Sequence, residues 1–246
     1  MKSAKFRPAP RLYLPGSLNP GAEIALTETV RSHASALRLR AGDAIRLFNG
    51  TGGEYAAVLV QSGRELRASV GGFADSDCES PLRVTLAQCL SSGDRMDITL
   101  QKATELGVSA IQPLQSTRSI VRLDAERMAR KQVHWQNVVI AACEQCGRNT
   151  VPVVAPTADI ATWLASRPAA GTLLMLSPEA TTGIRDIKLA ADISLLVGPE
   201  GGLSPEEQAM AQAAGFTGLR LGPRVLRTET APLAALAALQ AMWGDL

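Results

Sequence analysis

Side chains that could do chemistry follow two short aliphatic runs near the end of the chain. The runs at residues 193–197 and 219–221 each end in a Gly-Pro pair, which a charged loop and a helix start follow. The first loop carries Glu200, and the second carries Arg224 and Arg227. Ligands of open α/β sheets bind beyond the carboxyl ends of strands, so this repetition predicts a pocket. Two ordinary strand-to-helix turns are the alternative.

The first loop leads into a helix start with a strong local signature. Ser204 can cap the helix, Pro205 fits its first position, and Glu207 stands three residues after the cap, as in a capping box. With Glu206 this start is acidic, whereas a phosphate site favours bare amides and a lysine. Neither GxxxxGK[ST] nor GxGxxG occurs in the chain. We therefore expect a ligand that is neutral or cationic at its reacting end, rather than ATP or NAD.

The elements that position these loops alternate between strand and helix. Strands are expected at residues 83–90, 110–114, 151–155, 172–176, 193–197 and 217–221, and helices near 95–106, 124–146, 160–166 and after each of the last two strands. This alternation is typical of an α/β fold with a mostly parallel sheet and helices on both faces.

The first part of the chain has a different pattern. Short strands at 23–26, 43–48, 54–60 and 65–70 accompany one helix at 28–39, and the stretch 49–53 (Asn-Gly-Thr-Gly-Gly) is a hairpin signal. This pattern predicts a small β-barrel. The glycine, acidic and proline residues of 71–81 indicate a linker, so we place the domain boundary between residues 73 and 74.

Charge is divided unevenly between these parts. Residues 1–73 hold ten Lys and Arg against five Asp and Glu, a balance of +5, and residues 74–246 hold fifteen against eighteen, a balance of −3. The basic part suits a polyanion, and Arg7 and Arg11 lie near Phe6 and Tyr13, which add the capacity for base stacking. A frayed, solvated terminus is the alternative.

Composition indicates a globular protein of 246 residues with a real core. No apolar run is long enough for a membrane span, and the first residues lack the apolar region of a secretory signal. The four cysteines fit a reduced cytoplasm. Cys143 and Cys146 form a CxxC pair without a second pair at metal-ligand spacing, so we expect buried thiols rather than a metal or redox site. His33 and His134 are expected to be structural.

The last predicted helix, residues 231–243, is apolar on nearly every side, with Leu236 and Leu239 among many alanines. A terminal helix of this kind needs cover on more than one side. We therefore expect a homodimer.

Three runs carry a resemblance to a known family: 141–148 (AACEQCGR), 196–203 (LVGPEGGL) and 221–230 (LGPRVLRTET). In order and spacing the chain resembles the RsmE family of 16S ribosomal RNA uracil-N3 methyltransferases, in the SPOUT (α/β-knot) superfamily. The resemblance implies a PUA-like RNA-binding β-barrel at residues 1–73 and an α/β-knot methyltransferase domain at 74–246. It also implies a C-terminal trefoil knot, formed by the loops after Leu176, Val197 and Leu221, that holds S-adenosylmethionine in a homodimer.

The resemblance, together with the charge pattern, assigns the site residues. The cofactor-binding residues would be Leu176, Val197, Gly198, Pro199, Glu200, Gly201, Leu221, Gly222, Val225, Leu226 and Thr228. The RNA-binding residues would be Arg7, Arg11, Lys102, Arg118, Arg148 and Arg224, with Glu144 as a further cleft residue. Two structural alternatives stay open: Lys102 would pair with Glu105 on a helix surface, and Arg224 and Arg227 would pair with Glu229 at a helix start.

The implied reaction sets a chemical requirement. A uracil N3 carries a proton at neutral pH, so its methylation needs a base or a nearby positive charge that favours the uracil anion. Glu200 and Glu229 are the candidate bases, and Arg227 or Arg224 is the candidate for stabilising the anion. The sequence does not choose between the two bases. Because N3 lies on the pairing edge, the target must be unpaired or flipped out.

We therefore expect a cytoplasmic, metal-free enzyme that uses S-adenosylmethionine to methylate N3 of a uridine in the 16S ribosomal RNA of the small subunit. The nearest alternative is another SPOUT methylation, such as ribose 2′-O-methylation, although the chain has no Asn-x-Gly-Asn run. An alternative of a different class is a non-catalytic ribosome-assembly factor that binds RNA through its basic barrel.

Overall fold

The computed structural model describes residues 9–119, 124–166, 171–189 and 192–246. The chain divides into two compact units. The first comprises Met1–Glu79 together with Cys143–Val151, and the second comprises Ser80–Ala142 together with Pro152–Leu246. The boundary expected between residues 73 and 74 lies shortly before this division and stays a prediction. No sequence pattern indicated that residues 143–151 belong with the first unit.

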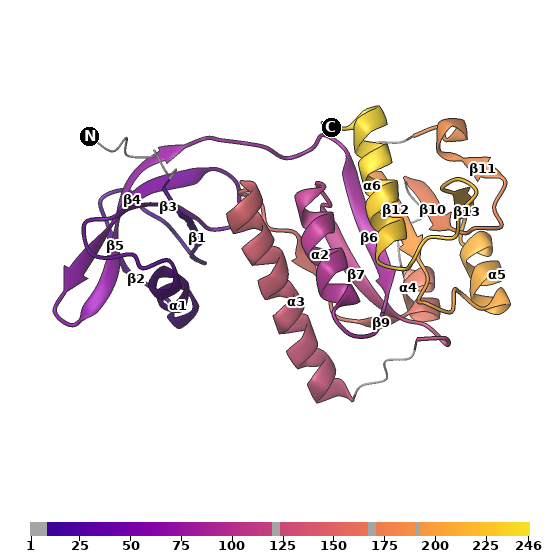
Figure 1. Cartoon of the computed structure of the whole chain (residues 1–246), viewed down its shortest axis with the longest axis horizontal. Helices are drawn as coiled ribbons and strands as arrows, with labels where there is room; N and C mark the ends of the chain where they lie inside the picture. Colours follow the sequence, from indigo (N-terminus) through magenta and orange to yellow (C-terminus); the bar gives the residue numbers. More distant parts are fainter. Residues whose placement is uncertain (1–8, 120–123, 167–170, 190–191) are drawn as a thin grey trace. The chain divides into compact units, whose positions relative to one another are not determined.

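The first unit is built on a sheet whose described strands follow the order β1-β3-β4-β5-β2 (Figure 1). Its elements are β1 (Arg11–Tyr13), β2 (Glu23–Ala25), α1 (Glu28–Ala36), β3 (Ala44–Phe48), β4 (Glu54–Ser62) and β5 (Glu65–Ala74). The predicted hairpin is confirmed, because β3 and β4 pair antiparallel on either side of residues 49–53. Alternate strand residues, among them Ile45, Leu47 and Leu59, point inward and form the core.

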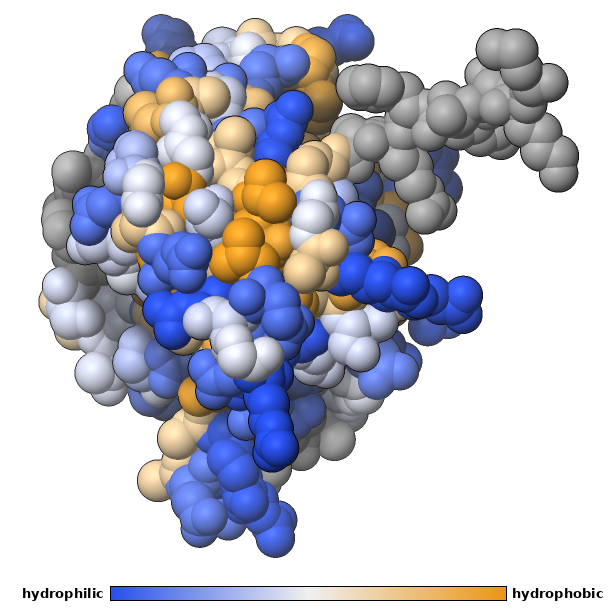
Figure 2. Space-filling view, turned by 90° about the vertical axis from the view of Figure 1, so that its left-hand side faces the viewer, coloured by the Kyte–Doolittle hydropathy of each residue, from blue (hydrophilic) through white to orange (hydrophobic). Residues whose placement is uncertain are grey.

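The end of a long helix, α3 (Ala125–Cys146), and the residues after it complete the first unit. Gly50 and Thr51 in the hairpin turn form β-bridges with Thr150, and the backbone N–H of Tyr13 donates to the carboxylate of Glu144 over 2.8 Å. The face of the molecule that Figure 2 shows, on the side of the N-terminal sheet, is mainly hydrophilic around a small hydrophobic patch. Residues 143–151 are thus held by backbone and side-chain contacts far apart in the sequence.

The second unit contains a parallel sheet with the described order β11-β13-β10-β12-β6-β7-β8, and β9 pairs with β7. Its strands are β6 (Arg83–Cys89), β7 (Ala110–Gln115), β8 (Val153–Val154), β9 (Ala158–Asp159), β10 (Thr172–Leu176), β11 (Thr182–Gly183), β12 (Asp192–Val197) and β13 (Thr217–Arg220). Besides α3, its helices are α2 (Arg95–Glu105), α4 (Ile160–Ser166), α5 (Pro205–Ala213) and α6 (Thr230–Trp243), with the short 3-10 turn η1 (Ile184–Asp186). The predicted α/β architecture is therefore confirmed.

Helices cover both faces of this sheet (Figure 1). On one face, Ala87 and Cys89 of β6 belong to a buried cluster with Ile160 of α4 and Ala211 of α5. On the other, α6 packs against α2 and β12. The alternation of β6 side chains between the faces follows from the period of two in a strand.

The C-terminal strands are threaded rather than laid down in order. β13 lies between β10 and β11, two strands that residues 177–181 already connect. The backbone N–H of Ser177 donates to the carbonyl of Leu219 over 3.0 Å, and a Cβ on Gly218 would lie 3.1 Å from the Cβ of Ala180. The connecting segment therefore crosses β13 at close range, an arrangement that the predicted trefoil knot requires.

The last helix, α6, is anchored by one buried polar side chain. Gln240 is 1% exposed, donates to the carbonyl of Leu106 over 3.1 Å and accepts from the hydroxyl of Ser80 over 2.6 Å. Leu236 and Leu239 are fully buried beside it, whereas Met242 is 44% exposed. Thus α6 buries one face in its own chain and leaves apolar atoms of another face accessible. Within the described residues, no helix has the length and apolar character of a membrane span.

Candidate functional site

The loops after β10, β12 and β13 converge on a cavity of about 650 Å³ in the second unit. Every residue predicted to hold a cofactor lines this cavity, namely Leu176, Val197, Gly198, Pro199, Glu200, Gly201, Leu221, Gly222, Val225, Leu226 and Thr228. Arg118, Arg224, Arg227 and Glu229 line it as well. The structure thus brings the predicted loops together, while their assignment to a cofactor stays a prediction.

The loop between β12 and α5 is a tight turn. A Cβ on Gly198 would lie 3.0 Å from the backbone N of Leu203, and Gly202 has a φ of 68°, which favours glycine. The predicted capping box follows: Ser204 and Glu207 exchange hydrogen bonds of 2.8 and 3.2 Å between side chains and backbone. This prediction is confirmed, and the cap fixes where the loop ends.

The carboxylate of Glu207 also accepts hydrogen bonds from a distant loop, which the sequence did not predict. It is 1% exposed and also accepts from the backbone N–H of Thr117 over 2.8 Å and the hydroxyl of Ser116 over 3.3 Å. A buried carboxylate of this kind needs several donors. Glu207 therefore ties the end of β7 to the start of α5, so its charge serves the fold rather than facing a ligand.

Thr228 joins two of the cavity loops. Its hydroxyl donates to the carbonyl of Gly198 over 2.8 Å and accepts from the side chain of Gln88 over 3.2 Å. Thr228 is 8% exposed and Gln88 is fully buried. The loop after β13 is thereby pinned to the loop after β12 and to β6, which sets the width of the cavity.

Glu200 is held by three donors at the cavity rim. It accepts from the backbone N–H and the hydroxyl of Ser92, both over 2.9 Å, and from the guanidinium of Arg95 over 2.7 Å. Burial alone would raise the pKa of Glu200, but these hydrogen bonds outweigh it, and the pKa lies below its ordinary value. The Glu200 carboxylate is therefore stabilised in its ionised form, which makes it a poor proton acceptor.

Glu229 stands on the other side of the same arginine with fewer partners. Its Oε2 atom is buried and has no hydrogen-bond partner among the described residues. The Nε atom of Arg95 lies 3.8 Å from it, within ion-pair range but beyond a hydrogen bond. The Glu229 carboxylate therefore has fewer hydrogen-bond donors than that of Glu200, and its expected role as a base stays a prediction.

Arg224 and Arg227 are exposed side chains of the loop between β13 and α6. Within the described residues, neither forms an ion pair, and Glu229 pairs with Arg95 instead. The alternative of salt bridges at the helix start is therefore wrong. Val225, between them in sequence, is 81% exposed and lines the cavity. An apolar side chain so exposed beside two unpaired cations is suited to a ligand with an apolar face and an anionic part.

Arg118 contributes to the cavity rim from the loop after β7. Its guanidinium donates to the carbonyl of Gly201 over 3.0 Å, while its side chain remains exposed. Arg118 thus supports the glycine turn and still faces solvent, so its expected contact with RNA stays a prediction.

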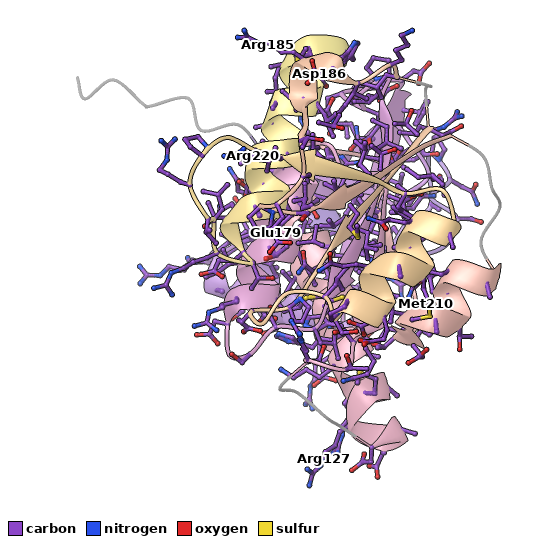
Figure 3. All side chains as sticks on the ribbon, turned by 90° about the vertical axis from the view of Figure 1, so that its right-hand side faces the viewer. Arg127, Glu179, Arg185, Asp186, Met210 and Arg220 are labelled. Atoms are coloured by element: carbon purple, nitrogen blue, oxygen red, sulfur yellow. The ribbon has the colours of Figure 1, made fainter. Side chains whose placement is uncertain are left out.

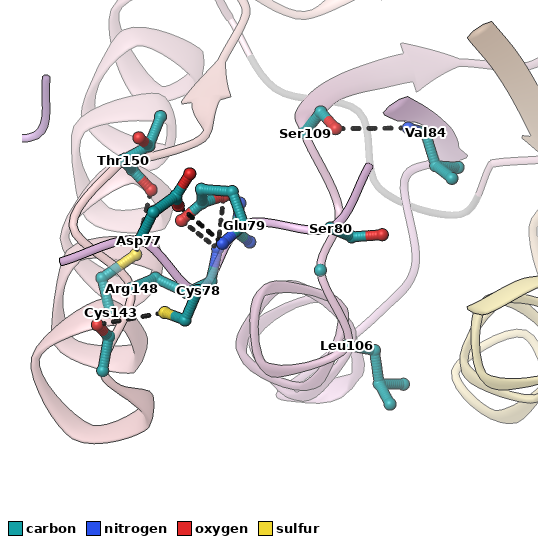
Figure 4. Close-up of polar contacts among 12 residues, drawn as sticks. Asp77, Cys78, Glu79, Ser80, Val84, Leu106, Ser109, Cys143, Arg148 and Thr150 are labelled. Carbon is teal, nitrogen blue, oxygen red and sulfur yellow. Dashed lines mark hydrogen bonds and ion pairs between the residues drawn. The ribbon is translucent and has the colours of Figure 1, made fainter. Parts of the chain in front are cut away.

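Two arginines expected to bind RNA are instead structural. Arg148 is 5% exposed, and its Nε atom donates to both carboxylate oxygens of Glu79 over 3.1 and 3.0 Å (Figure 4). Arg11 donates to the carbonyl of Arg148 over 2.9 Å and to the side chain of Asn149 over 2.6 Å, and its guanidinium lies 4.8 Å from the ring centroid of Phe48. Both guanidinium groups are largely buried and form hydrogen bonds within the first unit, although Arg11 Nε has no hydrogen-bond partner among the described residues. This arrangement corrects the expectation of RNA contacts by these two side chains.

Other predicted cleft residues also lie outside the cavity. Lys102 pairs with Glu105 on the surface of α2 over 2.8 Å, which matches the structural alternative. In the first unit, the carboxylate of Glu144 pairs with the Nδ1 atom of His33 over 3.1 Å, and burial raises the pKa of Glu144. Arg7 lies outside the described residues.

Sequence reasoning missed Arg95 and Ser92 as site residues. Both follow β6, whose end meets the ends of β10 and β12 at the same edge of the parallel sheet. The end of a third strand was the available signal, because side chains there point toward the same cavity. Glu179 was missed too; it follows β10, lines the cavity and is seen in Figure 3.

The cysteines are free, with Cys89 and Cys143 buried. Burial raises the pKa of Cys143 to about 12, so its thiol stays protonated near neutral pH. Among the described residues, no three His, Cys, Asp or Glu side chains gather as metal ligands would. His134 pairs with Asp97 on the surface over 2.6 Å, in a structural role.

Comparison with known proteins agrees with this arrangement. An RNA methyltransferase domain model matches residues 78–240, and an RNA methyltransferase PUA domain model matches residues 26–68. The ribosomal RNA small subunit methyltransferase E of Buchnera aphidicola is 33% identical, over 96% of this chain and 98% of that protein.

Two solved structures are similar over nearly their full length. A ribosomal RNA small subunit methyltransferase E from Neisseria gonorrhoeae, bound to S-adenosyl methionine, is 46% identical with a TM-score of 0.92, over 96% of this chain and 99% of that one. A putative methyltransferase from Legionella pneumophila, in complex with the same cofactor, is 38% identical with a TM-score of 0.93, over 98% and 100% of the two chains. The SPOUT-type architecture is thereby confirmed, and the chain belongs to the ribosomal RNA small subunit methyltransferase E family.

Proposed function

We propose that this protein uses S-adenosylmethionine to methylate N3 of a uridine in the 16S RNA of the small ribosomal subunit. The observation that carries this proposal is the convergence of three C-terminal loops on one cavity, in a chain whose relatives are named for methylation of small-subunit ribosomal RNA. The SAM-bound structures of similar chains support the choice of cofactor.

The cavity fits this cofactor in size and chemistry. Its volume of about 650 Å³ lies in the range of small-molecule sites. Val225 and Leu226 offer an apolar wall for an adenine ring, and the carboxylate of Glu179 complements the cationic groups of the methionine part. When bound, S-adenosylmethionine supplies a methyl group on a positively charged sulfur. The protein must then hold that methyl group in line with the attacking atom.

The proposed proton acceptor is Glu229. Glu200 and Glu229 were equal candidates in the sequence, but three donors stabilise the Glu200 carboxylate, and its pKa is lowered. The Glu229 carboxylate has no such donor among the described residues, and its side chain is 20% exposed at the cavity, so it can accept the N3 proton. Arg95, between the two, positions both carboxylates.

Arg227 is proposed to stabilise the uracil anion. Removal of the N3 proton spreads negative charge onto the uracil carbonyl oxygens, and a guanidinium beside them lowers the energy of that state. Arg224 and Arg118 are proposed to contact RNA phosphate at the rim, where both are exposed.

RNA capture is proposed for the N-terminal domain, residues 1–73, with catalysis in residues 74–246. The match to a PUA domain model and the charge of +5 in residues 1–73 support this division. The exposed apolar face of α6, with Met242 at 44% exposure, supports a homodimer. We further propose that the enzyme acts in the cytoplasm and needs no metal.

Calorimetric titration with S-adenosylhomocysteine tests whether the protein binds the proposed cofactor. We expect one cofactor per chain to bind the wild-type protein. The Val225→Asp variant should bind at least tenfold more weakly, because a charge replaces the proposed adenine contact. Met210→Asp on α5 introduces the same charge at another exposed apolar position and should leave binding intact. Absence of binding by folded wild-type protein would overturn the proposal.

A further inference from the structure

A second, smaller pocket lies on the other side of the loop that carries Ser92. It has a volume of about 170 Å³ and lies in the second unit, between the loop before α2 and the side of α3. Its lining residues are Leu90, Ser91, Gly93, Asp94, Met96, Lys131 and Trp135. A hydrogen-bond contact of 2.6 Å between His134 Nε2 and Asp97 joins α3 and α2 beside it.

Two buried polar groups of this pocket lack partners. Ser91 is 7% exposed and Trp135 is 4% exposed, and neither the Ser91 hydroxyl nor the Trp135 Nε1 atom has a hydrogen bond within the described part of the chain. Buried polar groups in native proteins are nearly always satisfied, by protein, water or ligand. Two unsatisfied groups lining one pocket indicate that a polar molecule completes them.

The remaining lining residues specify the chemistry of that molecule. Lys131 is exposed and forms no ion pair with a described residue, so its ammonium can meet a phosphate. The Asp94 carboxylate caps no backbone amide of α2 and can accept from an exocyclic amino group. Leu90 and Met96 provide an apolar wall. A base with an amino group and a carbonyl, attached to a phosphate, satisfies all of these groups.

The loop that lines the small pocket also contacts the large cavity. Ser91 and Asp94 line the small pocket, whereas their neighbours Ser92 and Arg95 hold Glu200 at the rim of the large cavity. One short loop, residues 90–96, therefore contributes side chains to both the small pocket and the rim of the large cavity.

We propose that the small pocket binds a nucleotide of the RNA next to the target uridine, and that its base carries an exocyclic amino group, as cytosine and guanine do. This inference rests on the proposed function, because it makes the pocket part of the substrate site. Binding there places the target uridine over the large cavity and contributes to the choice of uridine.

The test uses the full chain and compares Lys131→Ala with Arg130→Ala. Both variants remove one charge from α3, but Arg130 pairs with Glu126 and lies outside the pocket lining. Methylation of small ribosomal subunits from cells that lack the activity gives KM and kcat. We expect Lys131→Ala and Ser91→Ala to raise KM for the subunit about three- to tenfold, with kcat and S-adenosylhomocysteine affinity within twofold of wild type. Lys131→Ala should also reduce the slope of log affinity against log salt by about one, whereas Arg130→Ala should change neither quantity by as much.

A second measurement is independent of methyl transfer. Cytidine 5′-monophosphate should change the fluorescence of the wild-type protein, and Trp135→Phe should abolish that change while the other two tryptophans remain. Equal KM values for Lys131→Ala, Ser91→Ala and Arg130→Ala, with no response to the nucleotide, would show that the pocket holds only water and overturn the inference. If wild-type protein transfers no methyl group but Trp135 still responds, the proposed function fails while the pocket stands as a nucleotide site.

Discussion

The guanidinium of Arg95 lies 2.7 Å from the carboxylate of Glu200 and keeps that carboxylate engaged at the cavity rim. On its other side, 3.8 Å separates Arg95 Nε from Glu229. The two carboxylates therefore differ in their hydrogen bonds. We propose that Glu200 is a positioning residue and that Glu229 accepts the proton.

Amide substitutions separate these two tasks. Glu229→Gln should lower kcat by about a hundredfold or more, the usual effect of removing a general base. Glu200→Gln keeps an oxygen that can accept from Ser92, so kcat should fall by less than about tenfold. Single-turnover methylation with saturating cofactor measures both. Equal losses in the two variants, or a larger loss in Glu200→Gln, would reverse the assignment.

The crossing of β13 by residues 177–181 depends on a missing side chain. A Cβ on Gly218 would lie 3.1 Å from Ala180 Cβ, so Gly218→Val should destabilise the second unit by about 1–3 kcal/mol through overpacking. The midpoint of thermal unfolding reports this loss. In a double variant, Ala180→Gly should restore part of the unfolding midpoint that Gly218→Ala loses, because it removes the Cβ that the new alanine would contact.

Gly72→Ala is the matched control for this series. Gly72 has no atom within 4 Å of an added Cβ and has no positive φ. Its substitution should change the midpoint little or raise it, because alanine restricts the unfolded chain. A Gly218→Val variant as stable as Gly72→Ala would show that the crossing segment is not tightly packed.

Thr228 offers a test of how the cavity loops are joined. Thr228→Val removes the donor to Gly198 and the acceptor for Gln88, and the unsatisfied groups should cost about 1–3 kcal/mol of stability. Affinity for S-adenosylhomocysteine should fall in parallel, because the two loops separate. Thr228→Ser keeps the hydroxyl and should restore both. If Thr228→Val binds S-adenosylhomocysteine as tightly as wild type, the hydrogen bonds of Thr228 to Gly198 and Gln88 do not affect ligand binding.

Local signals in the sequence were sufficient for much of this structure. The helix at 160–166 and the strand at 172–176 were predicted with the bounds that the structure has, and the Ser204–Glu207 cap was read from four residues. Each of these features depends on hydrophobic period or on hydrogen bonds within one turn. The cavity loops could be predicted for a similar reason, since Gly-Pro pairs mark the strand ends.

The site residues that were wrongly predicted or missed are those whose partners lie far away in the sequence. Arg11 and Arg148 are of the residue type that commonly binds RNA. However, Arg11 bonds to Asn149, 138 residues away, and Arg148 bonds to Glu79, 69 residues away. Arg95 was missed because Glu200, which reveals its role, is 105 residues further along the chain. A charge pattern cannot distinguish a solvated guanidinium from one that is buried against a distant carboxylate.

Burial of Glu144 predicts a pH dependence of stability. Burial raises its pKa above the ordinary value of 4.5. The folded protein therefore binds this proton more tightly than the unfolded chain, and the associated stability is present below the unfolded pKa and lost as pH rises through the folded pKa. Relative to wild type, Glu144→Gln should be more stable at pH 7 than at pH 4, as measured by thermal unfolding.

Asp192 provides a control of opposite sign. The hydrogen bond from Arg83 lowers its pKa below 3.8, so its contribution is present above the unfolded pKa and lost as pH falls through the folded pKa. Relative to wild type, Asp192→Asn should therefore be less stable at pH 7 than under strongly acidic conditions. Parallel pH profiles for the two variants would contradict at least one of the two assignments.

The most direct test of the proposed activity is to map the methyl group. Small ribosomal subunits from cells that lack the activity are incubated with the protein and S-adenosylmethionine, and the 16S RNA is digested and analysed by mass spectrometry. We predict one new 3-methyluridine with wild-type protein and at least a hundredfold less with Arg227→Ala. A methyl group on a ribose 2′-oxygen, or no methylation by protein that binds the cofactor, would contradict the account.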